Sequence, residues 1–265
     1  MLPLKDNVPT LRRPVVTWVL LVVNILVFAA TVTAPDTTLP DFDGGTRVPV
    51  SGFDAVTLEY GFTPCELSER CPADDRGTVV VAGTESDVET VRVPDVPVLL
   101  TLLTSMFLHG GLLHLGGNML FLFIFGNNVE DAMGRLRFVL FYLVAGLAAH
   151  LVQFSIDPAS DIPNIGASGA IAGILGGYLL LYPRARVLTA ITLVIFFYVI
   201  EVPALLVLGL WFVLQIVDGS AALASPQSGG VAYWAHIGGF VAGFLLIRLF
   251  TRGRSPAPPR RGRYA

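Results

Sequence analysis

Four polar side chains whose types suit acyl transfer lie near the beginnings of apolar blocks in this sequence: Ser168, His236, Asn118 and His114. A serine with a histidine in reach supplies a nucleophile and its general base. A serine at the start of a helix also gains from the free N–H groups and the dipole there, which favour developing negative charge. Asn118 and His114 carry groups that can donate hydrogen bonds to a tetrahedral oxyanion, so the residue types together predict nucleophilic acyl chemistry.

The composition decides what kind of chain must position these groups. Hydrophobic residues make up 54% of the 265 residues and charged residues 14%, whereas soluble domains carry about 25% charge. The mean hydropathy is +0.69, and the apolar residues form continuous blocks, which membranes require and soluble cores do not. A soluble enzyme and a disordered chain are excluded. The net charge of −3 offers no basic field for nucleic acid.

The apolar blocks predict an all-α polytopic membrane protein with six transmembrane helices. A span needs about 20 residues. The fifth block is too long for one span, and Glu201-Val202-Pro203 interrupts it. We therefore predict that the fifth helix has its core at Pro203–Val217 and that Val187–Ile200 is an apolar connection, either re-entrant or part of a long fifth helix; two separate spans are the alternative. The blocks are Val15–Val32, Gly111–Phe125 with a lead-in from Val98, Phe138–Phe154, Ile165–Tyr182, Val187–Val217 and Val231–Phe250.

The basic residues predict the orientation. With six spans and a cytoplasmic N-terminus, 13 of the 17 Lys and Arg residues lie in inner segments, and the four others share a long first loop with 13 acidic residues. This asymmetry follows the positive-inside rule, and a seventh span would break it. The predicted parts are a cytoplasmic tail (1–14), the first helix (15–33), an acidic extracytoplasmic loop (34–97), a core of five helices (98–250) and a basic, disordered cytoplasmic tail (251–265).

This orientation places the four polar groups at one depth, because the second, fourth and sixth spans all enter from the outside. At about 1.5 Å of rise per residue, Ser168 lies roughly 5 Å and His236 roughly 7.5 Å below the start of their blocks. Singly, such residues are more often helix caps or structural histidines, as we expect for His150. Their shared depth favours a joint site. With no acidic residue in the helices beside His236, the sequence predicts a dyad.

Glycines recur every four residues in both helices of this predicted pair. Gly169, Gly173 and Gly177 follow Ser168, and Gly239 and Gly243 follow His236. Stripes of small residues let helix backbones approach closely. If the two stripes face each other, the serine and the histidine meet at one end of the contact.

The first loop holds the two cysteines, Cys65 and Cys71. On the outer, oxidising side they could close a small disulfide loop, and free thiols are the alternative. The alternating stretch Thr78–Val93 indicates a small hairpin.

The motifs His109–Asn118 with Met119, Gly166–Gly169, and Ala235–His236 with Gly239 and Gly243 resemble those of the rhomboid family of intramembrane serine proteases. The resemblance implies that Ser168 is the nucleophile and His236 the base, that Asn118 and His114 are oxyanion donors, and that His109 has a supporting role. It also implies that Glu130 is a structural acidic residue. The sequence departs from the family in three respects: the first loop is longer than expected and lacks a Trp-Arg pair, and Ala172 stands where some members place an aromatic residue that stacks on the histidine.

The resemblance implies a multi-pass protein of the cell membrane, without metal or cofactor, that cleaves transmembrane segments of other membrane proteins near their extracytoplasmic ends. Two alternatives belong to other classes. One is an inactive rhomboid-like protein that binds membrane clients. The other is a membrane hydrolase that uses His109, His114 and His236 as zinc ligands.

Overall fold

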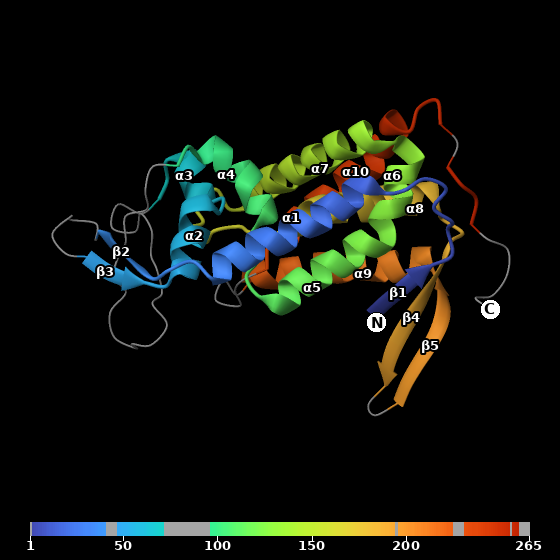
Figure 1. Cartoon of the computed structure of the whole chain (residues 1–265), viewed down its shortest axis with the longest axis horizontal. Helices are drawn as coiled ribbons and strands as arrows, with labels where there is room; N and C mark the ends of the chain where they lie inside the picture. Colours follow the sequence, from blue (N-terminus) through green and yellow to red (C-terminus); the bar gives the residue numbers. More distant parts are fainter. Residues whose placement is uncertain are drawn as a thin grey trace. The chain divides into compact units, whose positions relative to one another are not determined.

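The computed structural model describes residues 2–40, 47–71, 96–193, 196–224, 231–254 and 256–259. The chain divides into two compact units. The first comprises Met1–Val22, Gly116–Gln153 and Ser168–Ala265, and the second comprises Val23–Leu115 and Phe154–Ala167. Figure 1 labels the elements. The prediction of a hairpin at Thr78–Val93 falls outside the described residues, as do residues 260–265 of the predicted disordered tail.

The fold is mostly helical, as predicted. Within the described residues, five helices or helical runs are long and apolar enough to span a membrane: α1 (Val15–Val32), the run Leu112–Met133, α7 (Arg135–Ile156), α9 (Ala204–Ala224) and α10 (Tyr233–Phe250). The run consists of α5 (Leu112–Phe121), the π-helical η2 (Leu122–Gly126) and α6 (Asn127–Met133). Helix α8 (Ser168–Leu181) is apolar but has only 14 residues. The number of six spans therefore stays a prediction.

The fifth apolar block begins as a β-hairpin, a structure that the sequence did not predict. Strands β4 (Arg186–Leu193) and β5 (Phe196–Pro203) pair antiparallel, and β1 (Leu2–Asp6) pairs with β4 to complete a sheet in the order β1-β4-β5. Val187–Ile200 is rich in β-branched and aromatic residues, which pack well on a pleated sheet. Helix α9 then begins at Ala204, which confirms the predicted fifth helix and extends it beyond Val217.

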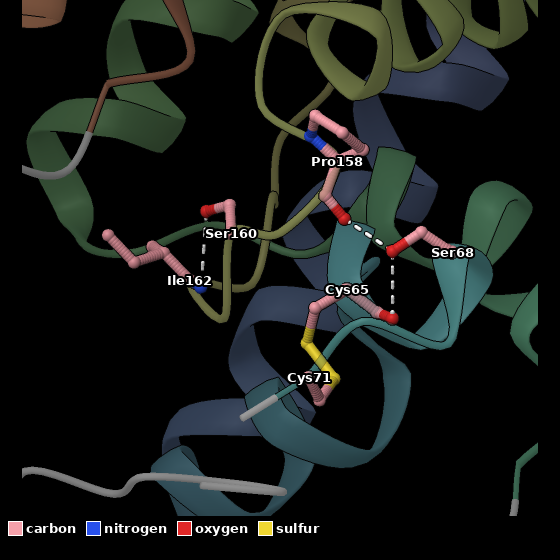
Figure 2. Close-up of a disulfide and its surroundings, with 6 residues drawn as sticks. All are labelled: Cys65, Ser68, Cys71, Pro158, Ser160 and Ile162. Carbon is pink, nitrogen blue, oxygen red and sulfur yellow. Dashed lines mark hydrogen bonds between the residues drawn. A yellow bond between two sulfur atoms is a disulfide. The ribbon is translucent and has the colours of Figure 1, made fainter. Parts of the chain in front are cut away.

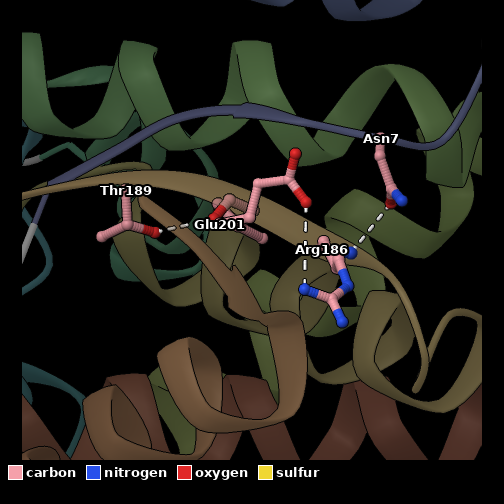
Figure 3. Close-up of polar contacts among 5 residues, drawn as sticks. Asn7, Arg186, Thr189 and Glu201 are labelled. Atoms are coloured by element: carbon pink, nitrogen blue, oxygen red, sulfur yellow. Dashed lines mark hydrogen bonds and ion pairs between the residues drawn. The ribbon is translucent and has the colours of Figure 1, made fainter. Parts of the chain in front are cut away.

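Polar contacts hold this sheet together at the Arg186 end of the hairpin (Figure 3). The Arg186 guanidinium lies 3.9 Å from a Glu201 carboxylate oxygen on the paired strand. The Arg186 backbone N–H donates to Asn7 Oδ1 at 2.8 Å, and the Asn7 N–H donates to the Arg186 carbonyl at 3.0 Å. Asn7 thus continues the β1-β4 pairing beyond the last residue of β1.

Buried polar side chains of the first unit fix its N-terminal segment. The Glu130 carboxylate accepts hydrogen bonds from the backbone N–H groups of Val16 (3.0 Å) and Thr17 (2.7 Å), so it caps the start of α1. Asp6 accepts from Asn128 Nδ2 (2.5 Å) and Tyr178 Oη (2.6 Å), while burial raises the pKa of Asp6 to about 7. The structural role expected for Glu130 is consistent with its capping of α1.

In the second unit, the acidic loop has more structure than the sequence predicted. Strands β2 (Thr37–Pro40) and β3 (Arg47–Val50) pair antiparallel, and they are followed by α2 (Gly52–Tyr60) and α3 (Pro64–Ser68). Ser51 caps α2 by accepting from the Asp54 N–H at 3.1 Å. Further along the chain, α4 (Val98–Thr104) runs into the 3₁₀ turn η1 (Ser105–Phe107).

A disulfide joins Cys65 to Cys71, which confirms the predicted bond (Figure 2). The turn that it closes packs against the segment before α8. The Ser68 hydroxyl donates to the Pro158 carbonyl at 2.5 Å, and the Cys65 N–H donates to the Ser160 carbonyl at 3.0 Å. The loop is therefore anchored to the chain that leads toward Ser168.

Candidate active site

Ser168 is the first residue of α8. The chain reaches it through Gly166, whose φ of +129° lies in a region that side-chain-bearing residues rarely adopt. The Gly166 N–H donates to the Ser105 carbonyl at 2.8 Å, which fixes this turn. Because the first N–H groups of a helix have no acceptor within the helix, the start of α8 provides donors beside the Ser168 hydroxyl.

His236 lies in the first turn of α10, and its ring contacts both α8 and α9. Its Nε2 is 2.7 Å from Ser168 Oγ, and its Nδ1 is 2.6 Å from Gln215 Oε1. A carboxamide oxygen can only accept, so with Oε1 facing the ring Nδ1 carries the proton. Nε2 then carries a lone pair, which can accept the proton of the serine hydroxyl. This is the tautomer that a general base requires.

Glycines at the contact between α8 and α10 position the serine and the histidine. A Cβ added at Gly239 would overlap the Gly169 carbonyl, and one added at Gly243 would overlap the Gly173 carbonyl. The two glycine stripes therefore meet, which was the condition for bringing Ser168 and His236 together. Any side chain here would push the helix backbones apart.

The contact between α8 and α10 reaches from the first turn of each helix toward its interior. At the site end, a Cβ at Gly169 would lie 2.6 Å from the Ala149 Cβ of α7. Further along, a Cβ at Gly176 would overlap the Phe240 carbonyl. The glycine contacts, which we call the seam, thus begin beside Ser168 and His236.

Two residues of α9 that were not predicted from the sequence contact His236. Besides Gln215, the Trp211 ring lies with its centroid 5.9 Å from that of His236 and its plane tilted by 35°. The signal that identifies Asn118 also applies to Gln215, because it is a polar residue inside an apolar block. Trp211 carries no such signal, since aromatic residues are ordinary in apolar blocks.

Asn118 belongs to the same unit as Ser168 and His236. Its side chain is buried, and within the described residues its Nδ2 has no hydrogen-bond acceptor. A buried amide without an acceptor is costly. Its two N–H groups can therefore donate to a ligand oxygen, as the oxyanion prediction requires.

His109 and His114 belong to the second unit, where their rings contact each other edge to face at a centroid distance of 5.2 Å. The Gly110 N–H donates to His114 Nδ1 at 3.3 Å, and His109 Nδ1 lies 3.3 Å from the Phe107 carbonyl oxygen. Their participation at Ser168 stays a prediction. In the described part of the chain, no three His, Cys, Asp or Glu side chains are grouped so that they could hold a metal ion.

Comparison with known proteins identifies the family. The family model of the Rhomboid domain matches residues 97–253. "RHOMBOID-like protein 5" of Arabidopsis thaliana is 34% identical over 145 residues, which cover 55% of this chain and 42% of that protein. "Rhomboid protease GluP" of Bacillus subtilis is 36% identical over 147 residues, which cover 54% and 24%.

A third relative is likewise a rhomboid protein. "Rhomboid protein 1, mitochondrial" of Saccharomyces cerevisiae is 31% identical over 151 residues, which cover 55% of this chain and 40% of that protein. The chain thus spans less than half the length of each of these relatives. The matched residues include Asn118, Ser168 and His236 within the family's domain. The family model matches more than half of the chain. The chain therefore belongs to the rhomboid family, and it is a multi-pass membrane protein.

Proposed function

We propose that this protein is an intramembrane serine endopeptidase that cleaves transmembrane segments of other membrane proteins near their extracytoplasmic ends. The observation that carries the proposal is the 2.7 Å contact between Ser168 Oγ and His236 Nε2 at the ends of two tightly packed helices. Membership of the rhomboid family supports it, and one relative, GluP of Bacillus subtilis, is named a rhomboid protease.

In the proposed reaction, Ser168 Oγ attacks the scissile carbonyl carbon while its proton moves to His236 Nε2. The carbonyl oxygen becomes an oxyanion, which receives hydrogen bonds from Asn118 Nδ2, from His114 and from the backbone N–H at the start of α8. The intermediate then expels the amine, which takes the proton from His236. Water, deprotonated by the same histidine, then attacks the acyl carbon; the bond to Ser168 Oγ breaks, and His236 returns the proton to Ser168 Oγ as the carboxylic acid leaves.

We assign Gln215 the role of a positioning residue. The contact from Nδ1 to Gln215 Oε1 at 2.6 Å orients the imidazole and keeps its proton on Nδ1. An amide carries no charge, so it stabilises the imidazolium less than a carboxylate would. The proposed catalytic unit is thus a dyad with a neutral orienting group. The Trp211 ring lies beside the His236 ring at a centroid distance of 5.9 Å, whereas Ala172, four residues after the serine, has no ring that could stack on it.

The packing around Ser168 constrains the substrate. An intact transmembrane helix keeps its carbonyl groups in backbone hydrogen bonds, so the segment must unwind before a peptide bond reaches the serine. Gly, Pro and other weak helix formers near the cut favour unwinding. Because the seam leaves little room beside Ser168, we expect a small residue before the scissile bond.

The proposed topology has six spans with both termini in the cytoplasm. The arginines near the chain ends and the inner turns support it through the positive-inside rule. In this topology α8 and α10 begin at the extracytoplasmic side, and the disulfide-containing loop lies there as well. The cut is therefore expected near the extracytoplasmic end of the substrate segment.

Cleavage of a single-span model substrate in proteoliposomes tests the proposal. Wild-type protein and Ser220→Ala should cut it, and Ser168→Ala should not. Ser220 is a matched control because its hydroxyl donates to the Ile216 carbonyl of its own helix. Equal cleavage by Ser168→Ala would place the nucleophile elsewhere. Substrate binding without cleavage by wild type would favour the inactive client binder, and loss of activity with a chelator that zinc restores would favour the metal hydrolase.

A further inference from the structure

A cavity of about 350 Å³ in the first unit is surrounded by arginines and is not part of the proposed active site. Its lining includes four arginines and two carboxylates: Arg12, Arg13, Arg135, Arg254, Glu130 and Asp131. The volume falls within the range of about 300–1,000 Å³ that is typical of small-ligand sites. Positive charge exceeds negative charge around it, so a ligand with an anionic group is expected.

The cavity lies where three helices with the length and composition of membrane spans have their ends. Arg13 precedes the first residue of α1 by two positions, Arg135 is the first residue of α7, and Arg254 follows the last residue of α10 by four. The ends of transmembrane helices lie at the level of the lipid headgroups. The cavity therefore lies in the layer that contains lipid phosphate groups.

The two carboxylates of the lining are engaged with the backbone rather than with the arginines. Glu130 caps α1, and Asp131 Oδ2 accepts from the Leu11 N–H at 2.8 Å. Within the described residues, the four guanidinium groups make no ion pair or side-chain hydrogen bond. The nearby Arg137, in contrast, donates to the carbonyls of Phe250 and Arg252. Four guanidinium groups thus remain available to bind an anion.

The backbone at Gly134 makes space for one of the four guanidinium groups. Gly134 has a φ of +83°, and a Cβ there would lie 2.9 Å from both terminal nitrogens of Arg254. The guanidinium of Arg254 thus rests against the backbone of the turn between α6 and α7. A residue with a side chain would be strained at this φ and would displace the arginine.

Exposed leucines adjoin the arginines in the sequence. Leu11, next to Arg12, is 72% exposed, and Leu136, next to Arg135, is 75% exposed. Guanidinium groups together with accessible apolar side chains at the membrane boundary suit a ligand with an anionic head and a hydrocarbon tail. A soluble anion would contact only the guanidinium groups.

We infer that this cavity is a binding site for the phosphate headgroup of an anionic phospholipid, with the arginines as donors to the phosphate oxygens. Basic pockets between transmembrane helices bind lipid headgroups in this way. In the proposed topology the lipid belongs to the cytoplasmic leaflet. A bound headgroup would join the segment before α1, the start of α7 and the chain after α10 at one point.

Native mass spectrometry of the purified full chain in mild detergent can test this inference. Phosphatidylglycerol should bind more tightly than phosphatidylcholine with the same acyl chains. The variant Arg135→Gln/Arg254→Gln should weaken phosphatidylglycerol binding roughly tenfold or more. The matched control Arg184→Gln/Arg252→Gln removes the same charge from the cytoplasmic side in the proposed topology, but neither residue lines the cavity, so its affinity should change less than roughly twofold.

Three results would overturn the inference: equal binding of the two lipids, equal losses in the two double variants, or displacement of phosphatidylglycerol by inorganic phosphate at equal concentration. Thermal unfolding in lipid-free detergent shows whether each variant is folded. If Arg135→Gln/Arg254→Gln does not fold, Arg12→Gln/Arg13→Gln replaces it. Both of those residues are exposed and precede α1, and the same tenfold criterion applies.

Discussion

The seam between α8 and α10 and the face of α9 position the same histidine by different means. In the seam, glycines allow backbone to contact backbone, and a Cβ at Gly243 would overlap the Gly173 carbonyl. Helix α9 contacts His236 through the side chains of Gln215 and Trp211, and Gly209 of α9 has no heavy atom of the described residues within 4 Å of an added Cβ. In the proposed mechanism the seam therefore sets the distance between Ser168 and His236, whereas α9 sets the orientation of the His236 ring.

The largest effect is expected at the end of the seam itself. Ser168→Ala and His236→Ala should each abolish cleavage, and the double variant should be no slower than either single variant. When two residues act as one catalytic unit, removing either one already eliminates the rate contribution of both. Initial rates on one model substrate measure this. Multiplicative losses would mean that the two side chains act independently, despite their 2.7 Å separation.

Asn118 belongs to neither the seam nor α9, so its removal separates the chemical step from the positioning of the dyad. Asn118→Ala should lower kcat by about 10²–10³, the usual cost of one oxyanion donor, with little change in KM. The loss will be smaller if His114 and the backbone N–H compensate. A change confined to KM would assign Asn118 to substrate binding.

Glycine substitutions test the comparison directly, because the seam and α9 predict opposite signs. Gly243→Ala should destabilise the protein by about 1–3 kcal/mol through overpacking, and misplacement of the dyad should lower activity roughly hundredfold. Gly209→Ala should stabilise it by about 0.5–1 kcal/mol, because alanine is the better helix former where space is open. Thermal unfolding in detergent and cleavage rates measure both effects. Similar outcomes for the two variants would show that the seam is no more tightly packed than α9.

Much of the seam could be predicted from the sequence, because polar residues are costly in a membrane and close backbone contact requires small residues. Ser168, His236 and the glycine stripes follow from these two requirements. Gln215 met the first requirement as well, but the side of α9 that faces His236 depends on the rotation of that helix. Sequence periodicity does not determine this rotation in a helix that is apolar on all sides.

The β1-β4-β5 sheet was missed for a different reason. Its first strand ends at Asp6 and its second begins at Arg186, so the pairing joins residues about 180 positions apart. Val187–Ile200 is rich in β-branched residues, which favour strands. The local sequence, however, does not indicate a partner strand. The two glycine stripes lie on helices whose contact could be inferred from their matching spacing, whereas strands β1 and β4 show no such matching pattern.

Gln215→Leu should give the smallest of these effects, and it separates orientation from distance. Leucine fills similar space but accepts no hydrogen bond, so His236 loses its partner at Nδ1 while the seam stays intact. Because Trp211 still contacts the ring, we expect kcat to fall about tenfold, less than the 10²–10⁴ that a general base contributes. KM and thermal stability should change little. Gln215→Glu keeps an acceptor oxygen at the same distance along the side chain and should restore most of the rate. The rate of Ser168 labelling by a serine-directed covalent inhibitor should follow kcat across the three proteins. If Gln215→Leu and Gln215→Glu are equally slow, the residue acts through packing, and α9 contributes no orientation to the base.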